Sequence, residues 1–115
     1  MVRNLDHPEV KMTRYQAHGG GVAYMLLTTR HLQTLMFLAH GTVPCGEKLL
    51  GHVDPMEEIY IISAGSGLMQ VGEDIKEVKA GDAIHIPIGD FHELTNTGDE
   101  KLQVLVVAGL IPGNY

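Results

Sequence analysis

Residues 81–96 read GDAIHIPIGDFHELTN, and this stretch decides which kind of fold the chain can form. The short apolar runs at 83–86 and 91–96 have the length and composition of β-strands, and the proline and glycine within 87–89 predict a tight corner between them. His92 begins the returning strand, so its imidazole lies beside that corner. The stretch therefore predicts two strands joined by a corner that holds a candidate ligand.

The rest of the chain repeats this alternation of short apolar runs with turn residues and shows no sustained helical period. Glycines, aspartates and asparagines between the runs, among them Gly41 and Gly46, are typical of tight turns. Many short strands at regular spacing indicate an all-β sandwich or barrel. The further candidate strands are residues 22–29, 34–39, 48–53, 57–63, 67–71, 75–78 and 101–108.

The strand at 57–63 has two largely apolar faces, which is unusual for a strand with one side in water. Such a strand is expected to face the barrel interior on one side and a second sheet or a partner subunit on the other. Strict alternation of side chains assigns the faces. It puts Glu58, Tyr60 and Ile62 on the inward face and Glu57, Ile59 and Ile61 on the outward face.

A second chemistry-bearing stretch, residues 46–65, reads GEKLLGHVDPMEEIYIISAG. His52 and Asp54 are two residues apart on a predicted strand, so they project to the same side. Pro55 bends the chain, and Glu58 then opens the next strand on its inward face. Three potential ligands converge from about seven residues of sequence, and imidazole and carboxylate groups suit divalent Mn, Fe, Co, Ni or Zn.

Together these two stretches resemble the two sequence motifs of the cupin superfamily. Residues 81–96 match the second motif fully, whereas residues 46–65 match the first motif except that Asp54 replaces its second histidine. The resemblance implies an all-β fold, the cupin double-stranded β-helix, a jelly-roll-like barrel of two packed antiparallel sheets. It also implies one divalent metal ion per chain. His52, Glu58 and His92 carry over as ligands directly, and Asp54 carries over by position.

The replacement by Asp54 changes the expected charge of the site. Two carboxylates leave a divalent site neutral, so we expect weaker Lewis acidity, less attraction for anionic substrates and a preference for harder ions such as Mn(II) or Fe(II). Without metal, Asp54 and Glu58 repel each other, so one of them should have a raised pKa. Metal affinity should fall in mild acid. The alternative is a cupin that has lost its metal, with Asp54 solvated and the histidines only hydrogen-bonded.

Other residues receive weaker assignments. Tyr60 faces the same side as Glu58, so it is a candidate proton donor or part of the barrel lining. Cys45 lies in a loop near the barrel mouth, where a thiol could contact substrate or form a thioether, but it is expected to be buried and inert. His85 is assigned to an interface or a hydrogen bond rather than to the metal. Three residues on one face of an early strand are expected to pack in the core: Met36, Leu38 and His40.

The composition limits the possible classes of protein. A net charge of −6 with only eight scattered Lys and Arg residues argues against nucleic-acid binding and against an anionic membrane surface. No apolar run approaches the length of about 20 residues needed for a membrane span, and the N-terminus lacks the apolar core of a signal peptide. These features favour a cytoplasmic protein. Residues 1–20 are expected to be an irregular arm exchanged with a partner subunit, and residues 21–115 a single cupin barrel.

The expected function is that of a small-molecule metalloenzyme of the dioxygenase, decarboxylase, isomerase or lyase type. Its metal would serve as Lewis acid or redox centre for a small oxygenated substrate. The alternative is a non-catalytic ligand-binding or sensor module with a structural metal. A pocket of a few hundred Å³ beside the metal would favour the enzyme. The two-sided apolar strands also predict a homodimer.

Overall fold

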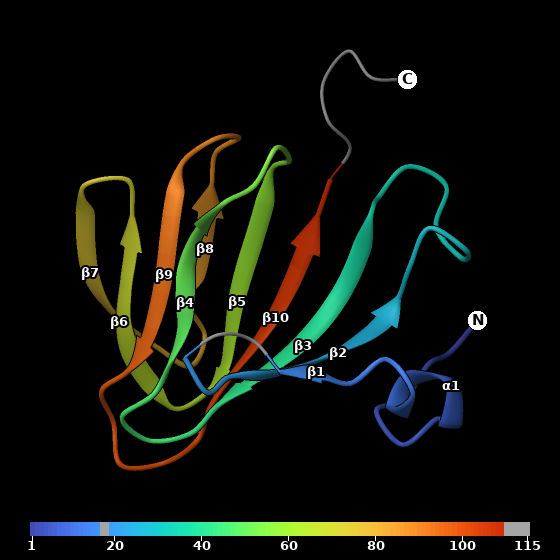
Figure 1. Ribbon diagram of the computed structural model, residues 1–115, viewed down its shortest axis with the longest axis horizontal. Coiled ribbons are helices and arrows are strands. Elements are labelled where there is room, and N and C mark those ends of the chain that lie inside the picture. Colours follow the sequence, from blue (N-terminus) through green and yellow to red (C-terminus); the bar gives the residue numbers. More distant parts are fainter. Residues whose placement is uncertain (17–18, 110–115) are drawn as a thin grey trace.

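The protein folds into two antiparallel β-sheets that pack face to face (Figure 1). The structure, a computed structural model, describes residues 1–16 and 19–109, apart from the side chains of Leu50 and His52. It confirms the predicted all-β class with two packed antiparallel sheets. The elements are α1 (Pro8–Lys11), β1 (Tyr15–Gln16), β2 (Val22–Leu27), β3 (Phe37–Val43), β4 (Lys48–Val53), β5 (Glu58–Ala64), β6 (Ser66–Val71), β7 (Asp74–Lys79), β8 (Ala83–Ile86), β9 (Phe91–Asn96) and β10 (Leu102–Ala108).

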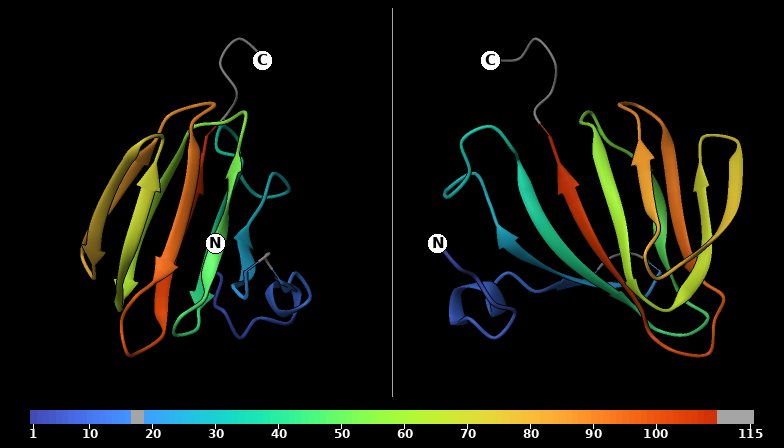
Figure 2. Two further views of the ribbon diagram at one scale, coloured as in Figure 1. Left: turned by 60° about the vertical axis from the view of Figure 1, so that its left-hand side comes forward. Right: turned by 180° about the vertical axis from the view of Figure 1, so that it is seen from behind.

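The chain crosses repeatedly between the two sheets, and this crossing brings the two sequence motifs together. One sheet has the order β1-β2-β3-β10-β5-β8, and the other has the order β4-β9-β6-β7. Figure 2 shows the two curved sheets facing each other. β4 and β5 come from the first motif, β8 and β9 from the second. Because β4 pairs with β9 and β5 pairs with β8, the motifs are neighbours in both sheets.

Alternating side chains from both sheets fill the space between them. Along β5 the buried positions are Glu58, Tyr60 and Ile62, as the sequence predicts, whereas Ile59 and Ile61 are exposed. A fully alternating pattern of this kind is typical of a strand with one face on the core. The buried cluster consists of Ala39, Val43, Tyr60, Ile62, Met69, Val78, Ile86, Leu94, Leu102, Val104 and Val106.

The predicted strands at 48–53, 83–86 and 91–96 match β4, β8 and β9 residue for residue. The early strand at 34–39 was misplaced, because β3 spans Phe37–Val43 and runs through Gly41 instead of turning there. A Cβ atom at Gly41 would lie 3.2 Å from Val104 Cγ1, so this glycine permits close packing of β3 on β10.

The assignment of faces on β3 was also wrong. The buried positions are Ala39, Gly41 and Val43, whereas Leu38 and His40 are half-buried on the opposite side of the strand. A shift by one residue exchanges the two faces of a strand. The expectation that Met36, Leu38 and His40 form part of the core therefore fails.

Part of the expected N-terminal arm packs on its own chain. β1 pairs with β2 through Tyr15 opposite Ala23, and Val10 of α1 is completely buried. The hydroxyl of Thr13 also accepts a hydrogen bond of 2.7 Å from the amide of Met25. The division at residue 20 and the exchange of residues 1–20 with a partner stay predictions. Among the described residues, no helix is both long enough and apolar enough to cross a membrane.

Candidate metal centre

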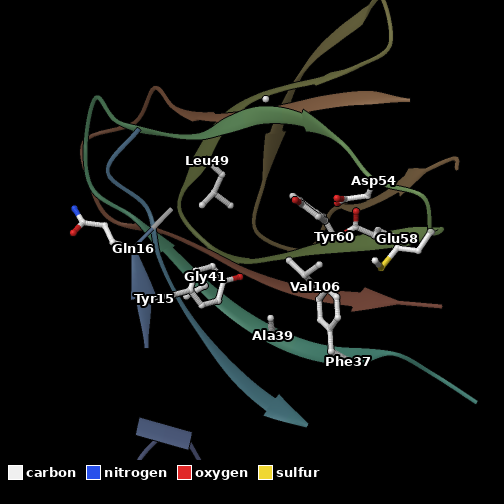
Figure 3. A pocket seen from close by; sticks show the side chains of 13 residues that line it. Tyr15, Gln16, Phe37, Ala39, Gly41, Leu49, Asp54, Glu58, Tyr60 and Val106 are labelled. Atoms are coloured by element: carbon white, nitrogen blue, oxygen red, sulfur yellow. The ribbon is translucent and has the colours of Figure 1, made fainter. Parts of the chain in front are cut away.

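Three side chains from the two motifs meet at one end of the sheets. Asp54 directly follows β4, Glu58 opens β5, and His92 is the second residue of β9. Each of the three offers a ligand atom, and these atoms all lie within 4.8 Å of one another. Figure 3 shows Asp54 and Glu58 side by side next to Tyr60. The structure thus forms a candidate metal-binding triad of two carboxylates and one imidazole.

The distances from His92 to the two carboxylates suit a shared cation better than direct hydrogen bonds. His92 Nε2 lies 3.7 Å from Asp54 Oδ2 and 3.6 Å from Glu58 Oε1. Both distances exceed hydrogen-bond length, whereas two ligands of one ion held at about 2.1 Å lie about 3–4 Å apart. Glu58 Oε1 is buried and makes no hydrogen bond within the described part of the structure. Because such an oxygen is costly to bury without a cation or donor, these residues fit a divalent ion.

His92 is held in a fixed orientation. Its side chain is 1% exposed, and its ring meets the ring of Tyr60 edge to face, with centroids 5.7 Å apart and an interplanar angle of 86°. Nδ1 lies 3.2 Å from the carbonyl oxygen of Asp90. Because a carbonyl only accepts, the hydrogen is on Nδ1, which leaves the Nε2 lone pair directed at the carboxylates. A backbone acceptor on the second ring nitrogen is the usual support of a metal-binding histidine.

The corner between β8 and β9 explains the proline and glycine of the second motif. The amide of Asp90 donates to the carbonyl of Pro87 at 3.2 Å, which closes a four-residue turn. Its third residue, Gly89, has a φ of +82°, a conformation that favours glycine, as in a type II turn. The Gly89 amide also donates to the carbonyl of Asp54 at 3.1 Å. The corner thus ties the second motif to the backbone of Asp54 in the first motif.

His52 can be placed only by its backbone, because its side chain lies outside the described part of the structure. Its backbone is directly opposite His92 in the register of β4 and β9. This register brings the His52 position to the strand that carries His92. Ligation by His52, and direct ligation by the other three residues, stay predictions.

The two carboxyl groups influence each other strongly. The pKa of Glu58 is raised from its ordinary 4.5 to about 9, mainly by burial and further by the hydrogen bond and charge of Asp54. The expectation of one raised carboxyl pKa is met, although burial and not repulsion is the largest cause. Burial likewise raises the pKa of Tyr60, with smaller contributions from Glu58 and Asp54. Tyr60 is therefore protonated at neutral pH and can donate a hydrogen bond.

A cavity of about 440 Å³ opens beside the carboxylates (Figure 3). Two of its residues, Tyr15 and Gln16, come from the segment expected to be an irregular arm, and sequence reasoning missed them. The glycines that follow them and precede the strand at 22–29 are a hairpin signal that could have indicated β1. The lining residues are Tyr15, Gln16, Ala23, Phe37, Ala39, Gly41, Leu49, Gly51, Asp54, Met56, Glu58, Tyr60 and Val106.

Cys45 and His85 both lie outside the triad. Cys45 is exposed, so the expectation of a buried thiol is wrong. It lies in the β3–β4 loop, at the opposite end of the sheets from the β4–β5 loop that carries Asp54 (Figure 1). His85 is exposed on β8, where its Nε2 lies 2.6 Å from Glu57 Oε2. The hydrogen bond expected for His85 is present, and this residue is not part of the triad.

The fold and the triad define a two-sheet β-protein with a mixed carboxylate and histidine site at one end. A family model for the cupin domain matches residues 39–108, more than half of the chain. The chain belongs to the cupin family, which confirms the resemblance of the two motifs.

Two curated relatives align with this part of the chain. An uncharacterised protein of Methanocaldococcus jannaschii is 44% identical over 69 residues, which are 59% of this chain and 55% of that protein. Auxin-binding protein 1 of Arabidopsis thaliana is 36% identical over 70 residues, 53% of this chain and 35% of that protein. The aligned parts thus span about half or less of the length of these relatives.

Solved structures resemble almost the whole chain. A Thermotoga maritima protein described as a predicted oxalate decarboxylase has a TM-score of 0.80 and 26% identity, covering 96% of this chain and 99% of that one. A polyketide cyclase from Streptomyces resistomycificus has a TM-score of 0.75 and 21% identity, covering 95% of this chain and 80% of that one. The second likeness establishes the fold alone.

Proposed function

We propose that this cupin binds one divalent metal ion and acts as a metalloenzyme on a small oxygenated molecule. The observation that supports the proposal is the juxtaposition of the triad with the cavity of about 440 Å³, because Asp54 and Glu58 belong to both. A structural metal site is closed by protein ligands, whereas a catalytic site keeps a position open toward its substrate.

The residues that would hold the ion are His52, Asp54, Glu58 and His92. Bound there, a divalent ion such as Mn, Fe, Ni, Co or Zn would supply Lewis-acid or redox chemistry at a substrate oxygen. Two carboxylates balance its charge, which favours the harder ions of this group. The chain would therefore contribute a neutral centre inside a largely apolar cavity.

The side chains around the cavity would bind and orient the substrate. Phe37, Leu49 and Val106 provide apolar walls that exclude water. The Tyr60 hydroxyl, protonated at neutral pH, would donate a hydrogen bond to a substrate oxygen. Burial makes it a weaker acid than an ordinary tyrosine, so hydrogen bonding suits Tyr60 better than the release of its proton.

The named relatives support a small-molecule role without fixing the reaction. One solved structure is described as a predicted oxalate decarboxylase and another as a polyketide cyclase. The proposed reaction is therefore of the dioxygenase, decarboxylase, isomerase or lyase type. A small-molecule partner, a cytoplasmic location and the absence of nucleic-acid or membrane partners are part of the same proposal.

A second candidate is a ligand-binding or sensor module without catalysis. The relative named auxin-binding protein 1 favours it, because that name describes binding only. Turnover that depends on the added metal would support the enzyme, whereas stoichiometric ligand binding without turnover would support the module.

The test is the metal content of the protein after it is loaded with Mn(II) or Fe(II) and freed of excess ions. Elemental analysis should find about one equivalent per chain in the wild type and a large loss in His92→Ala. His85→Ala removes an exposed histidine outside the triad and should keep the full equivalent. A wild-type protein that retains no metal, or equal retention in both variants, would contradict the proposal.

A further inference from the structure

We infer that the cavity beside the triad selects neutral, largely apolar molecules that carry an oxygen donor, such as phenols or ketones, over carboxylates such as oxalate. The inference deepens the proposed function and rests on it, because the same cavity would present the substrate to the metal. It is carried by the charge and the size of the described lining residues.

The cavity lacks positive charge in its described lining. None of the thirteen lining residues is Lys, Arg or His, whereas Asp54 and Glu58 supply two acidic groups. A divalent ion held by both carboxylates would leave the centre neutral. A carboxylate entering this space would lose its hydration and find no cationic side chain to pair with, which is costly in an apolar cavity.

The polar groups that remain are uncharged. Tyr15 and Gln16 lie across the cavity from Asp54 and Glu58 (Figure 3), and Tyr60 lies beside the two carboxylates. Hydroxyl and amide groups of this kind orient a phenol or ketone by single hydrogen bonds. They do not supply the bidentate, charged contacts by which arginine recognises a carboxylate.

One wall of the cavity has small side chains and would admit a flat molecule. Ala23, Ala39 and Gly41 lie on the adjacent strands β2 and β3 and have small side chains or none, so this wall is smooth. Phe37, Leu49 and Val106 supply larger apolar contacts. A volume of about 440 Å³ is within the range of small-molecule sites and has room for one or two fused rings.

A matched pair of probes isolates the effect of charge. 2-Naphthol and 2-naphthoate share the same rings, but only the second is an anion at pH 7. Titration calorimetry with the metal-loaded protein should give an affinity for 2-naphthol at least about tenfold higher than for 2-naphthoate. The same preference should persist in the metal-free protein, because the described lining still offers no cationic side chain to pair with 2-naphthoate.

A cation added at the rim should reverse the preference. Gln16→Arg places a positive charge on exposed β1 at the cavity and should shift the affinity ratio toward 2-naphthoate by about tenfold. Gln70→Arg adds the same charge on β6, among residues that do not line the cavity, and should leave the ratio unchanged.

Three results would overturn the inference: equal or tighter binding of 2-naphthoate by the wild type, no binding of either probe at millimolar concentration, or equal effects of the two arginine variants. These results are distinct from a failure of the proposed function. A protein that retains no metal would contradict the proposed metalloenzyme function. The relative affinity of that metal-free protein for 2-naphthol and 2-naphthoate would still test the inference about the cavity.

Discussion

Glu58 is a buried carboxyl group with a second carboxyl group beside it. Its side chain is only 3% exposed, yet Asp54 is close enough to add to the rise in its pKa. With a pKa of about 9, Glu58 is protonated at neutral pH in the metal-free protein. A metal ion that binds there must displace this proton, so its apparent affinity should increase with pH.

The first prediction concerns the stability of the metal-free protein. The pKa of Glu58 is about 9 in the folded state and near 4.5 when the chain is unfolded. Between these values the folded state holds a proton that the unfolded state releases. The free energy of unfolding should therefore fall as the pH rises from about 5 to 9. Urea unfolding of chelator-treated protein at a series of pH values measures this change.

The variant Glu58→Gln removes the titrating group and should flatten that pH dependence. At pH 8 it should unfold with a free energy about 1–3 kcal/mol above that of the metal-free wild type, because no buried carboxyl resists ionisation. Glu73→Gln alters an exposed carboxyl and should keep the wild-type slope. A wild-type stability that rises between pH 5 and 9 would refute this account of Glu58.

The sequence predicts which side chains face the core better than it predicts their pKa values. Strand alternation placed Glu58 and Tyr60 on the buried face, because the period of two is a local rule. The dominance of burial in the pKa of Glu58 was not predictable, since it depends on strands distant in sequence. Tyr15 was missed for a related reason. A two-residue strand such as β1 has no periodicity, and its pairing with β2 alone places it at the cavity.

At the scale of elements, an irregularity in β4 sets the register of the site. Leu49 pairs with Leu94 and His52 pairs with His92, so two residues of β4 face the single residue Glu93 of β9. This two-to-one arrangement is a β-bulge. The carboxylate of Glu93 accepts a hydrogen bond of 3.0 Å from the amide of Gly51 inside the bulge. Glu93 thus satisfies a backbone donor at the point where the ladder is interrupted.

The second prediction is that Glu93 stabilises the bulge through this hydrogen bond. Glu93→Ala removes the acceptor of the Gly51 amide and should lower the free energy of unfolding by about 1–2 kcal/mol. Glu93→Gln keeps a carbonyl oxygen in reach and should cost less than half as much. Urea unfolding at a single pH measures both variants.

Lys48 provides the control, because its ammonium also lies 3.3 Å from Glu93 on a partly exposed surface. Lys48→Ala tests the ion pair alone and should cost less than about 0.5 kcal/mol. If Lys48→Ala were as destabilising as Glu93→Ala, the ion pair and not the hydrogen bond to the bulge would explain the role of Glu93.

Most strands could be predicted from the sequence because glycines mark the turns between them. Strand boundaries are marked by Gly65, Gly81 and Gly89. All three have positive φ values, a backbone conformation that glycine adopts more readily than other residues. Gly41 led to the wrong boundary for β3, since a glycine needed for close packing looks the same in a sequence as a glycine needed for a turn. Only the approach of Val104 in the folded protein distinguishes the two.

The outer face of the larger sheet carries a row of apolar side chains. Ile59 and Ile61 are 41% and 37% exposed, and the neighbouring β10 places Val107 and Leu105 directly opposite them. Leu38 of β3 continues the row beside Val107. Contiguous exposed apolar side chains are typical of protein interfaces, so we propose that two copies of the chain pair through this face.

The third prediction follows from that face. Light scattering at micromolar concentration should give the mass of a homodimer, and the double variant Ile59→Glu, Ile61→Glu should shift it to a monomer. Ile75→Glu also adds a charge at an exposed isoleucine, but on β7 of the other sheet, and should remain dimeric. A monomeric wild type, or dissociation by Ile75→Glu alone, would contradict this interface.

The convergence of the two motifs was predictable only through the family resemblance. Local patterns identify β4, β5, β8 and β9, but nothing local says that β4 pairs with β9 while β5 pairs with β8. That pairing depends on the path of the whole chain between the sheets. The position of Asp54 against His92, at 3.7 Å, is a consequence of this topology and not of the spacing within either motif.

The most direct test of the metal centre is a crystal structure of the Mn(II)-loaded protein with anomalous diffraction data. We predict one strong anomalous peak per chain at about 2.0–2.3 Å from His92 Nε2 and from oxygens of Asp54 and Glu58. The peak should border the cavity. If protein loaded with one equivalent of Mn(II) gave no peak between these three residues, or a peak elsewhere, the metal centre proposed for His92, Asp54 and Glu58 would be wrong.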